Sequence, residues 1–204
     1  QAVGKIEVNV RALEVDLLSL SGHKLYGPMG VGALFVRRRP RVRLAPLVHG
    51  GGQERGLRAG TLPMPLIVGL GHAITLAEAA RVATTARHRS LREGLLQRLD
   101  RSGLRYSLNG AASPEQRLPG NLSLSFPDLP RDALFAAMAA HGIAVSSGSA
   151  CSSHDVAPSH VLTAMGVSAA LAQQTLRIGL GRDTSEADLI ALEKALLTAR
   201  TKAA

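Results

Sequence analysis

Two short apolar runs near the start of the chain predict β-strands. Residues 15–20 read Val-Asp-Leu-Leu-Ser-Leu, and residues 32–36 read Gly-Ala-Leu-Phe-Val. Apolar runs of this length, bounded by turn residues, are typical of buried strands. From Pro65 to about Leu99 the apolar positions recur at helical spacing, which predicts one long helix.

The rest of the chain alternates between the two periodicities. Alternating apolar and polar side chains at residues 122–126 predict a half-buried strand. Gly142 is a suitable residue to end the helix that we predict just before it. Asp183 and Glu186 have the spacing of a capping box ahead of a last helix. The further elements predicted are a helix at 131–140, a strand at 175–180 and a final helix through about residue 198.

Strands and helices in this order predict an α/β fold. We place a domain boundary near residues 79–83, inside or beside the long helix, and take residues 1–80 and 81–204 as two domains. The hydrophobic fraction of 46% in 204 residues is enough for such domains to have real cores, and it favours a soluble intracellular protein. No uninterrupted apolar run approaches the length of a membrane span, so we expect no membrane association.

The chain is strongly basic, with a formal net charge of +9. Such a charge suits an acidic partner or a nucleic acid. The basic residues are dispersed, however, except in the segment Arg37-Arg38-Arg39-Pro40-Arg41-Val42-Arg43, and only 2% of the residues are aromatic. Single-strand binding uses aromatic stacking platforms, so we consider nucleic-acid binding the weaker interpretation and a solvated strand end the stronger one.

Lys24 is a candidate for covalent chemistry because the chain has so few lysines. The others are Lys5, Lys194 and Lys202, and arginine supplies nearly all the remaining positive charge. Lys24 follows Ser21-Gly22-His23 at the end of a predicted strand and precedes a glycine-rich turn. Unlike arginine, lysine can lose its proton and serve as a nucleophile, a base or a Schiff-base partner. This segment alone leaves two interpretations open: a lysine that holds an aldehyde cofactor, or a solvated charge.

Cys151 is the only cysteine of the chain, in the sequence Ser-Ser-Gly-Ser-Ala-Cys-Ser-Ser-His-Asp. A structural cysteine usually lies in an apolar core, whereas these neighbours are small and polar. A thiol with a pKa of roughly 8.5 becomes more reactive beside positive charge, and His154 is near in sequence. A single cysteine forms no intrachain disulfide, which favours a reducing compartment such as the cytoplasm. The alternative is a bystander cysteine in a loop.

Two other site types fit the sequence poorly. His23 and His49 are not at zinc-ligand spacing, and one cysteine cannot build a thiolate site alone. The run Gly27-Pro28-Met29-Gly30-Val31-Gly32 lacks both the P-loop ending and the dinucleotide-binding spacing.

Taken together, the lysine and cysteine motifs resemble the pyridoxal-phosphate (PLP)-dependent cysteine desulfurases of aminotransferase class V, which have PLP fold type I. The Ser-Ser-Gly-Ser-Ala-Cys form resembles the iron–sulfur cluster assembly and nitrogen-fixation branch. The resemblance implies that residues 1–80 are the C-terminal part of the large PLP-binding domain, and that residues 81–204 are the small domain with the cysteine loop. The matching blocks are residues 1–5, 16–32, 48–61, 146–151 and 177–182.

The resemblance also implies a role for each site residue. Lys24 would hold PLP as a Schiff base and move the α-proton of the substrate, and Arg177 would bind the substrate carboxylate. Thr61 would bind the phosphate in the site of a neighbouring subunit, which implies a homodimer. Gln1 would bind the phenolic oxygen of PLP, and its phosphate would be bound by Ser21, Gly22 and His23.

The implied reaction takes sulfur from L-cysteine. L-Alanine leaves, and Cys151 keeps the sulfur as a persulfide for a sulfur acceptor such as an iron–sulfur cluster scaffold, or for transfer-RNA thiolation. The persulfide of Cys151 could also contact a nascent iron–sulfur cluster transiently.

One departure from the family pattern concerns Gln1. In the family this glutamine closely follows an aspartate that pairs with the pyridine nitrogen of PLP, and here the chain begins at the glutamine. We therefore expect the C-terminal half of a longer protein. Two alternatives stay open: a catalytically incomplete interaction module, and a selenocysteine lyase-like relative.

Overall fold

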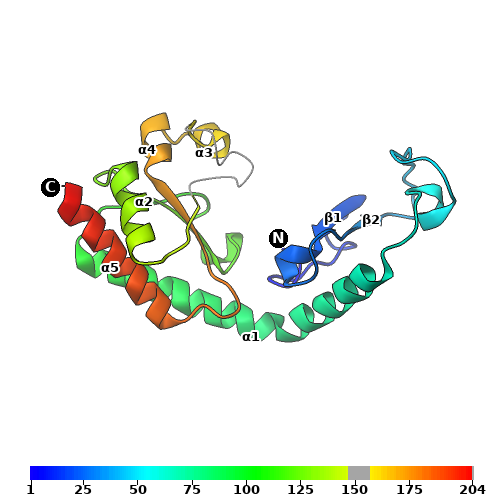
Figure 1. Cartoon of the computed structure of the whole chain (residues 1–204), viewed down its shortest axis with the longest axis horizontal. Helices are drawn as coiled ribbons and strands as arrows, with labels where there is room; N and C mark the ends of the chain where they lie inside the picture. Colours follow the sequence, from blue (N-terminus) through cyan, green and yellow to red (C-terminus); the bar gives the residue numbers. More distant parts are fainter. Residues whose placement is uncertain (147–156, 204) are drawn as a thin grey trace. The chain divides into compact units, whose positions relative to one another are not determined.

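A computed structural model describes residues 1–146 and 157–203 of the chain. The described residues form two compact units, Gln1–Ala83 and Thr84–Ala204. The long helix α1 (Met64–Ser102) begins in the first unit and ends in the second (Figure 1). The sequence analysis placed the domain boundary near residues 79–83, inside or beside the long helix.

The first unit contains a two-stranded antiparallel ribbon of β1 (Leu17–Ser21) and β2 (Gly32–Val36). Leu17 is opposite Val36, and Ser21 is opposite Gly32. Both predicted strands are present, but the prediction that they are buried is wrong within the described chain. Leu17 is 42% exposed and Leu34 52% exposed, because a ribbon needs a second layer over each face and the described residues leave these side chains open. The unit also has two 3₁₀ helices, η1 (Gly22–Leu25) and η2 (Gln53–Gly56).

The second unit is built on an antiparallel sheet in the order β3-β4-β5. Alternate residues of β4 and β5 face the core, and Leu122, Leu124 and Leu176 have no exposed surface. Helices α2 and α5 contact each other, and their buried side chains belong to the same hydrophobic core (Figure 1). The strands are β3 (Ser107–Leu108), β4 (Asn121–Ser125) and β5 (Thr175–Gly179). The helices are α2 (Arg131–Ala140), α3 (His160–Ala164), α4 (Ala169–Gln173) and α5 (Glu186–Ala203), with the 3₁₀ helix η3 (Pro114–Gln116).

The ends of two helices test the capping predictions. Helix α2 ends as predicted, because Gly142 follows it with a φ of 66°, a left-handed conformation that glycine adopts without strain. The capping box of α5 is shifted from the predicted pair by two residues. The amide of Ser185 donates to Asp188 Oδ2 (2.8 Å) and the amide of Asp188 donates to Ser185 Oγ (3.3 Å). Since α5 begins at Glu186, Ser185 is its N-cap and Asp188 its third residue.

Helix α1 has a strongly apolar stretch that is mostly exposed. By length and composition it is the one helix, among the described residues, that could cross a membrane: its 18-residue window has a mean hydropathy of 1.4 and is 11% buried. His72 and Glu78 lie within the apolar part of this helix, so it is not an uninterrupted apolar run of the kind that the sequence analysis looked for. A single such helix is weak evidence for a membrane span, since helices of soluble proteins pass the same test.

Candidate active site

The turn after β1 presents Lys24. Ser21 is the last residue of β1, and the next four residues form η1, with Gly22 and Leu25 buried and His23 and Lys24 exposed. The amide of Gly22 donates to the carbonyl oxygen of Val31 (2.9 Å), and the amide of Gly27 donates to that of Gly22 (3.0 Å). A Cβ atom at Gly22 would lie 2.9 Å from the carbonyl oxygen of Pro28, so only glycine allows this close approach.

These bonds change what can be expected of Gly22. Its amide is already used by Val31, so within this structure it does not offer a free donor to a phosphate. Its part in the turn is to let two backbone segments approach each other. The donors that remain at this end of β1 are the hydroxyl of Ser21, the imidazole of His23 and the amine of Lys24.

The positive charge of Lys24 interacts with that of Lys5. Burial lowers the pKa of Lys5, and the nearby charge of Lys24 lowers it further. The segment that carries Lys5 is seated beside η1, because a Cβ at Gly4 would lie 3.3 Å from Cδ2 of Leu25. Like charges this close together favour an anionic ligand, and an anionic aldehyde such as PLP suits amines and hydroxyls of this kind.

Thr61 lies at the end of a separate loop in the same unit. The loop is held by the amide of Gly60, which donates to Gln53 Oε1 (3.2 Å), and by Arg58 Nη1, which donates to the carbonyl oxygen of Ala59 (2.6 Å). Ala59 is buried, whereas Thr61 is exposed. An exposed hydroxyl on an anchored loop, such as that of Thr61, can contact a molecule outside its own unit.

Arg177 lies in the second unit, on an exposed position of β5 between the buried residues Leu176 and Ile178. Its Nη2 donates to Ser146 Oγ (3.1 Å). No carboxylate of the described residues pairs with its guanidinium. An exposed arginine with no acidic partner can bind a carboxylate from outside the chain.

Hydroxyl and amide groups share the sheet face that carries Arg177. Asn109 Nδ2 donates to Ser123 Oγ (3.2 Å) and to Ser125 Oγ (2.8 Å), and Ser125 Oγ lies 2.6 Å from Thr175 Oγ1. Ser125 and Thr175 are almost fully buried. A satisfied buried network of this kind makes the sheet around Arg177 rigid.

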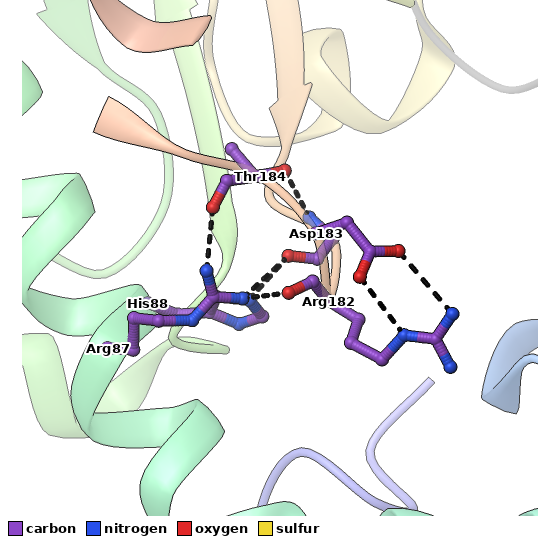
Figure 2. Close-up of polar contacts among 6 residues, drawn as sticks. Arg87, His88, Arg182, Asp183 and Thr184 are labelled. Atoms are coloured by element: carbon purple, nitrogen blue, oxygen red, sulfur yellow. Dashed lines mark hydrogen bonds and ion pairs between the residues drawn. The ribbon is translucent and has the colours of Figure 1, made fainter. Parts of the chain in front are cut away.

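Two side chains of α1 hold the loop that follows β5 (Figure 2). Arg87 Nη1 donates to the carbonyl oxygen of Thr184 (2.7 Å), and its Nη2 donates to those of Gly181 (3.4 Å) and Arg182. Nε2 of His88, which is 4% exposed, lies 2.9 Å from the same Gly181 oxygen. Arg87 and His88 therefore fix the backbone just beyond the strand of Arg177.

The sequence analysis did not find this loop clamp, although α1 carries a signal for part of it. His88, Arg92, Leu95 and Leu99 recur at core-facing helical spacing, and all four are buried. Polar residues at core-facing positions indicate a buried polar role. Nη1 of Arg92 has no hydrogen-bond partner among the described residues.

The predicted site residues fall into three groups. Gln1, Ser21, Gly22, His23 and Lys24 lie together in the first unit, which also contains Thr61, whereas Arg177 lies in the second. Cys151 lies outside the described residues. Within the described residues, no group of three or more His, Cys, Asp and Glu side chains could hold a metal ion.

Comparison with known proteins identifies the family of the chain. Residues 1–192 match the model of the aminotransferase class-V family. The chain belongs to this family. It is 51% identical over 189 residues to cysteine desulfurase IscS of Anaeromyxobacter dehalogenans, covering 93% of this chain and 46% of that protein. It is 47% identical to the rat cysteine desulfurase, covering 93% of this chain and 41% of the rat protein.

Solved structures of family members have the same fold. A NifS-like protein is 37% identical with a TM-score of 0.80, covering 97% of this chain and 50% of the other. The NifS-like protein of Rickettsia africae is 31% identical with a TM-score of 0.81, covering 95% of this chain and 50% of the other. The fold is thus α/β, of the PLP fold type I. The class-V chain spans about half the length of the curated relatives it matches.

Proposed function

We propose that this class-V protein acts as a PLP-dependent cysteine desulfurase, which converts L-cysteine into L-alanine and an enzyme-bound persulfide. The observation that carries the proposal is the turn after β1, which presents Lys24 next to Ser21 and His23 and close enough to Lys5 to affect its pKa. The similarity to cysteine desulfurases over 93% of the chain supports it.

The residues of the first unit fit PLP by their chemistry. Lys24 would bind the aldehyde covalently, and Ser21 and His23 would donate to its phosphate. Gln1 would donate to the phenolic oxygen, and Gly22 would let the backbone form the turn that presents these side chains. When bound, PLP withdraws electrons from the substrate α-carbon. Lys24 would take the α-proton of the substrate and return a proton to the product.

Arg177 and Cys151 would handle the two ends of the substrate. The exposed guanidinium of Arg177 would bind the α-carboxylate with two parallel hydrogen bonds. The thiolate of Cys151 would attack the substrate sulfur, so that a sulfur–sulfur bond forms while the carbon–sulfur bond of L-cysteine breaks. The carbon takes up a proton and leaves as L-alanine.

The remaining assignments concern assembly and destination. Residues 1–80 would be the C-terminal part of the large PLP-binding domain, and residues 81–204 the small domain. Thr61, exposed on its anchored loop, would reach the phosphate in the neighbouring subunit of a homodimer. The persulfide would pass to an acceptor such as an iron–sulfur cluster scaffold, in the cytoplasm.

The test is turnover of L-cysteine by the intact protein supplied with PLP. We expect alanine release and a mass increase of one sulfur atom on Cys151, both abolished in Lys24→Ala. Cys151→Ser should lose the sulfur adduct and sustained alanine release. Alanine release that is equal in wild type and Lys24→Ala, or absent from the wild type, would contradict the proposal.

A further inference from the structure

Arg177 is joined to Ser146 through both backbone and side chain. The amide of Arg177 donates to the carbonyl oxygen of Ser146 (2.7 Å), and the amide of Ser146 donates to that of Arg177 (3.3 Å). This is an antiparallel bridge on the edge of β5 that β4 leaves free. Arg177 Nη2 then donates to Ser146 Oγ (3.1 Å). The same half-buried serine thus fixes both the main chain and the guanidinium of Arg177.

One hydrogen bond of this kind orients a guanidinium without exhausting it. Arginine has five N–H donors in one plane, and the bond to Ser146 uses one of them. The second N–H of Nη2 and the pair on Nη1 remain for a carboxylate, which needs two parallel donors. Holding an otherwise flexible side chain in this orientation lowers the entropy lost when a carboxylate binds.

We propose that Ser146 is a positioning residue that fixes the Arg177 guanidinium for the substrate α-carboxylate, and so sets the preference for amino acids over amines without a carboxylate. This inference rests on the proposed desulfurase function. It also ties the substrate-binding arginine to a residue five places before Cys151 in the sequence.

Ser123 provides a matched control on the same sheet face. Its Cα is directly opposite Arg177 across the β4–β5 pair, and its hydroxyl accepts a hydrogen bond from Asn109 Nδ2 (3.2 Å). Ser123→Ala therefore removes a hydroxyl close to Arg177, whereas the hydrogen bond from the guanidinium goes to Ser146. Ser146→Thr keeps the hydroxyl and is suited to an extended backbone, so it serves as the rescue variant.

The experiment measures kcat and KM for L-cysteine in the intact, PLP-loaded wild type, Ser146→Ala, Ser146→Thr and Ser123→Ala. It also measures inhibition by cysteamine, which lacks the carboxylate. We expect Ser146→Ala to raise KM about tenfold with kcat within about twofold of wild type, because a hydrogen bond to a charged group that supports binding is lost. Ser146→Thr and Ser123→Ala should stay within about threefold of the wild-type KM, and cysteamine inhibition should not change.

Three results would overturn the inference. A KM in Ser146→Ala equal to that of Ser123→Ala would show that the hydroxyl does not position Arg177. A fall in kcat at constant KM would place Ser146 in a later step. Equal weakening of L-cysteine and cysteamine binding would indicate general disruption of the site. Loss of L-cysteine turnover already in the wild type would instead refute the proposed function, and the inference with it.

Discussion

The two units differ in how they bury their apolar side chains. In the second unit, the leucines of β4 and β5 and one face of α5 form a single core with no exposed surface at Leu122, Leu124 and Leu196. In the first unit the buried apolar residues are small or isolated: Leu25, Ala59, Leu70 and Ala73. Most large exposed apolar side chains of the described chain lie in this unit, for example Leu17, Leu34, Met64, Val68, Leu76 and Val82.

The two units therefore differ in what stabilises them. The second unit obtains hydrophobic stabilisation from its own residues. The first unit, which carries the turn with Lys24, has little core of its own. The curated relatives are about twice as long as this chain. We therefore expect the stability of the first unit to depend on contacts beyond the described residues, and the stability of the second unit to depend on its core.

Truncating one leucine in each sheet should give the largest difference. Leu124 of β4 has no exposed surface, whereas Leu34 of β2 is 52% exposed. Leu124→Ala should cost about 2–5 kcal/mol of unfolding free energy, because a cavity remains in a packed core. Leu34→Ala should cost less than about 0.5 kcal/mol. Urea unfolding followed by circular dichroism measures both, and equal losses would refute the contrast.

Removing the loop clamp should have a smaller effect. Arg87→Met leaves the carbonyl oxygens of Gly181, Arg182 and Thr184 without this donor, and should lower the unfolding free energy by about 1–2 kcal/mol. Arg98→Met is the matched control on the same helix, since Arg98 pairs with the exposed Glu186 and with no other acidic side chain that the structure describes. It should cost no more than about 0.5 kcal/mol. A loss in Arg98→Met as large as that in Arg87→Met would contradict the clamp.

The interaction between Lys5 and Lys24 in the first unit should lower the pH at which Lys5 titrates. Burial and Lys24 lower the pKa of Lys5, so folded protein releases its proton before the unfolded chain does. The stability of this unit should therefore rise with pH as pH passes from the lowered pKa toward the ordinary value of about 10.4. Site-resolved amine acylation against pH should give Lys5 a midpoint below that value.

Lys24→Met should move the midpoint of Lys5 upward, and Lys194→Met should leave it unchanged. The shift should be partial, because burial is the larger cause. An unchanged midpoint in Lys24→Met would show that the two amines do not interact.

The smallest effect is expected at Tyr106 in the second unit. Burial and the hydrogen bond to Asp100 Oδ1 (2.7 Å) raise the pKa of its phenol to about 12. The folded state favours the neutral phenol. The resulting stabilisation of the folded state is present below the ordinary tyrosine pKa of about 10 and is lost as pH rises through 12. In a Tyr26→Phe background, ultraviolet titration should show one late phenolate, and Asp100→Ala should bring it earlier. A midpoint near 10 in the Tyr26→Phe protein with Asp100 intact would refute the predicted rise in the pKa of Tyr106.

The sequence predicted local features better than distant ones. The strands predicted at residues 15–20 and 32–36 are found at residues 17–21 and 32–36, and helix α2 and the Gly142 cap also follow from periodicity and turn residues. Burial of the first two strands was predicted wrongly. Apolar side chains show that a strand favours burial, but they do not show whether residues of this chain pack over them. The capping box was placed two residues early because Asp183 and Glu186 have the same spacing as the true pair, Ser185 and Asp188.

The site shows the same division. The residues of the turn at Lys24 are consecutive, so their proximity was visible in the sequence. Ser146 lies 31 residues before Arg177, and Arg87 lies 97 residues before Thr184, so only the fold brings each pair together. No local pattern marks such a pair.

The most direct test of the account is to trap PLP on the intact protein with borohydride and to map the reduced adduct by mass spectrometry. Within this chain the candidates are Lys5, Lys24, Lys194 and Lys202, which peptide mapping distinguishes. The account predicts an adduct on Lys24, lost in Lys24→Ala while the protein remains folded. An adduct on another lysine with none on Lys24, or no adduct at all, would contradict it.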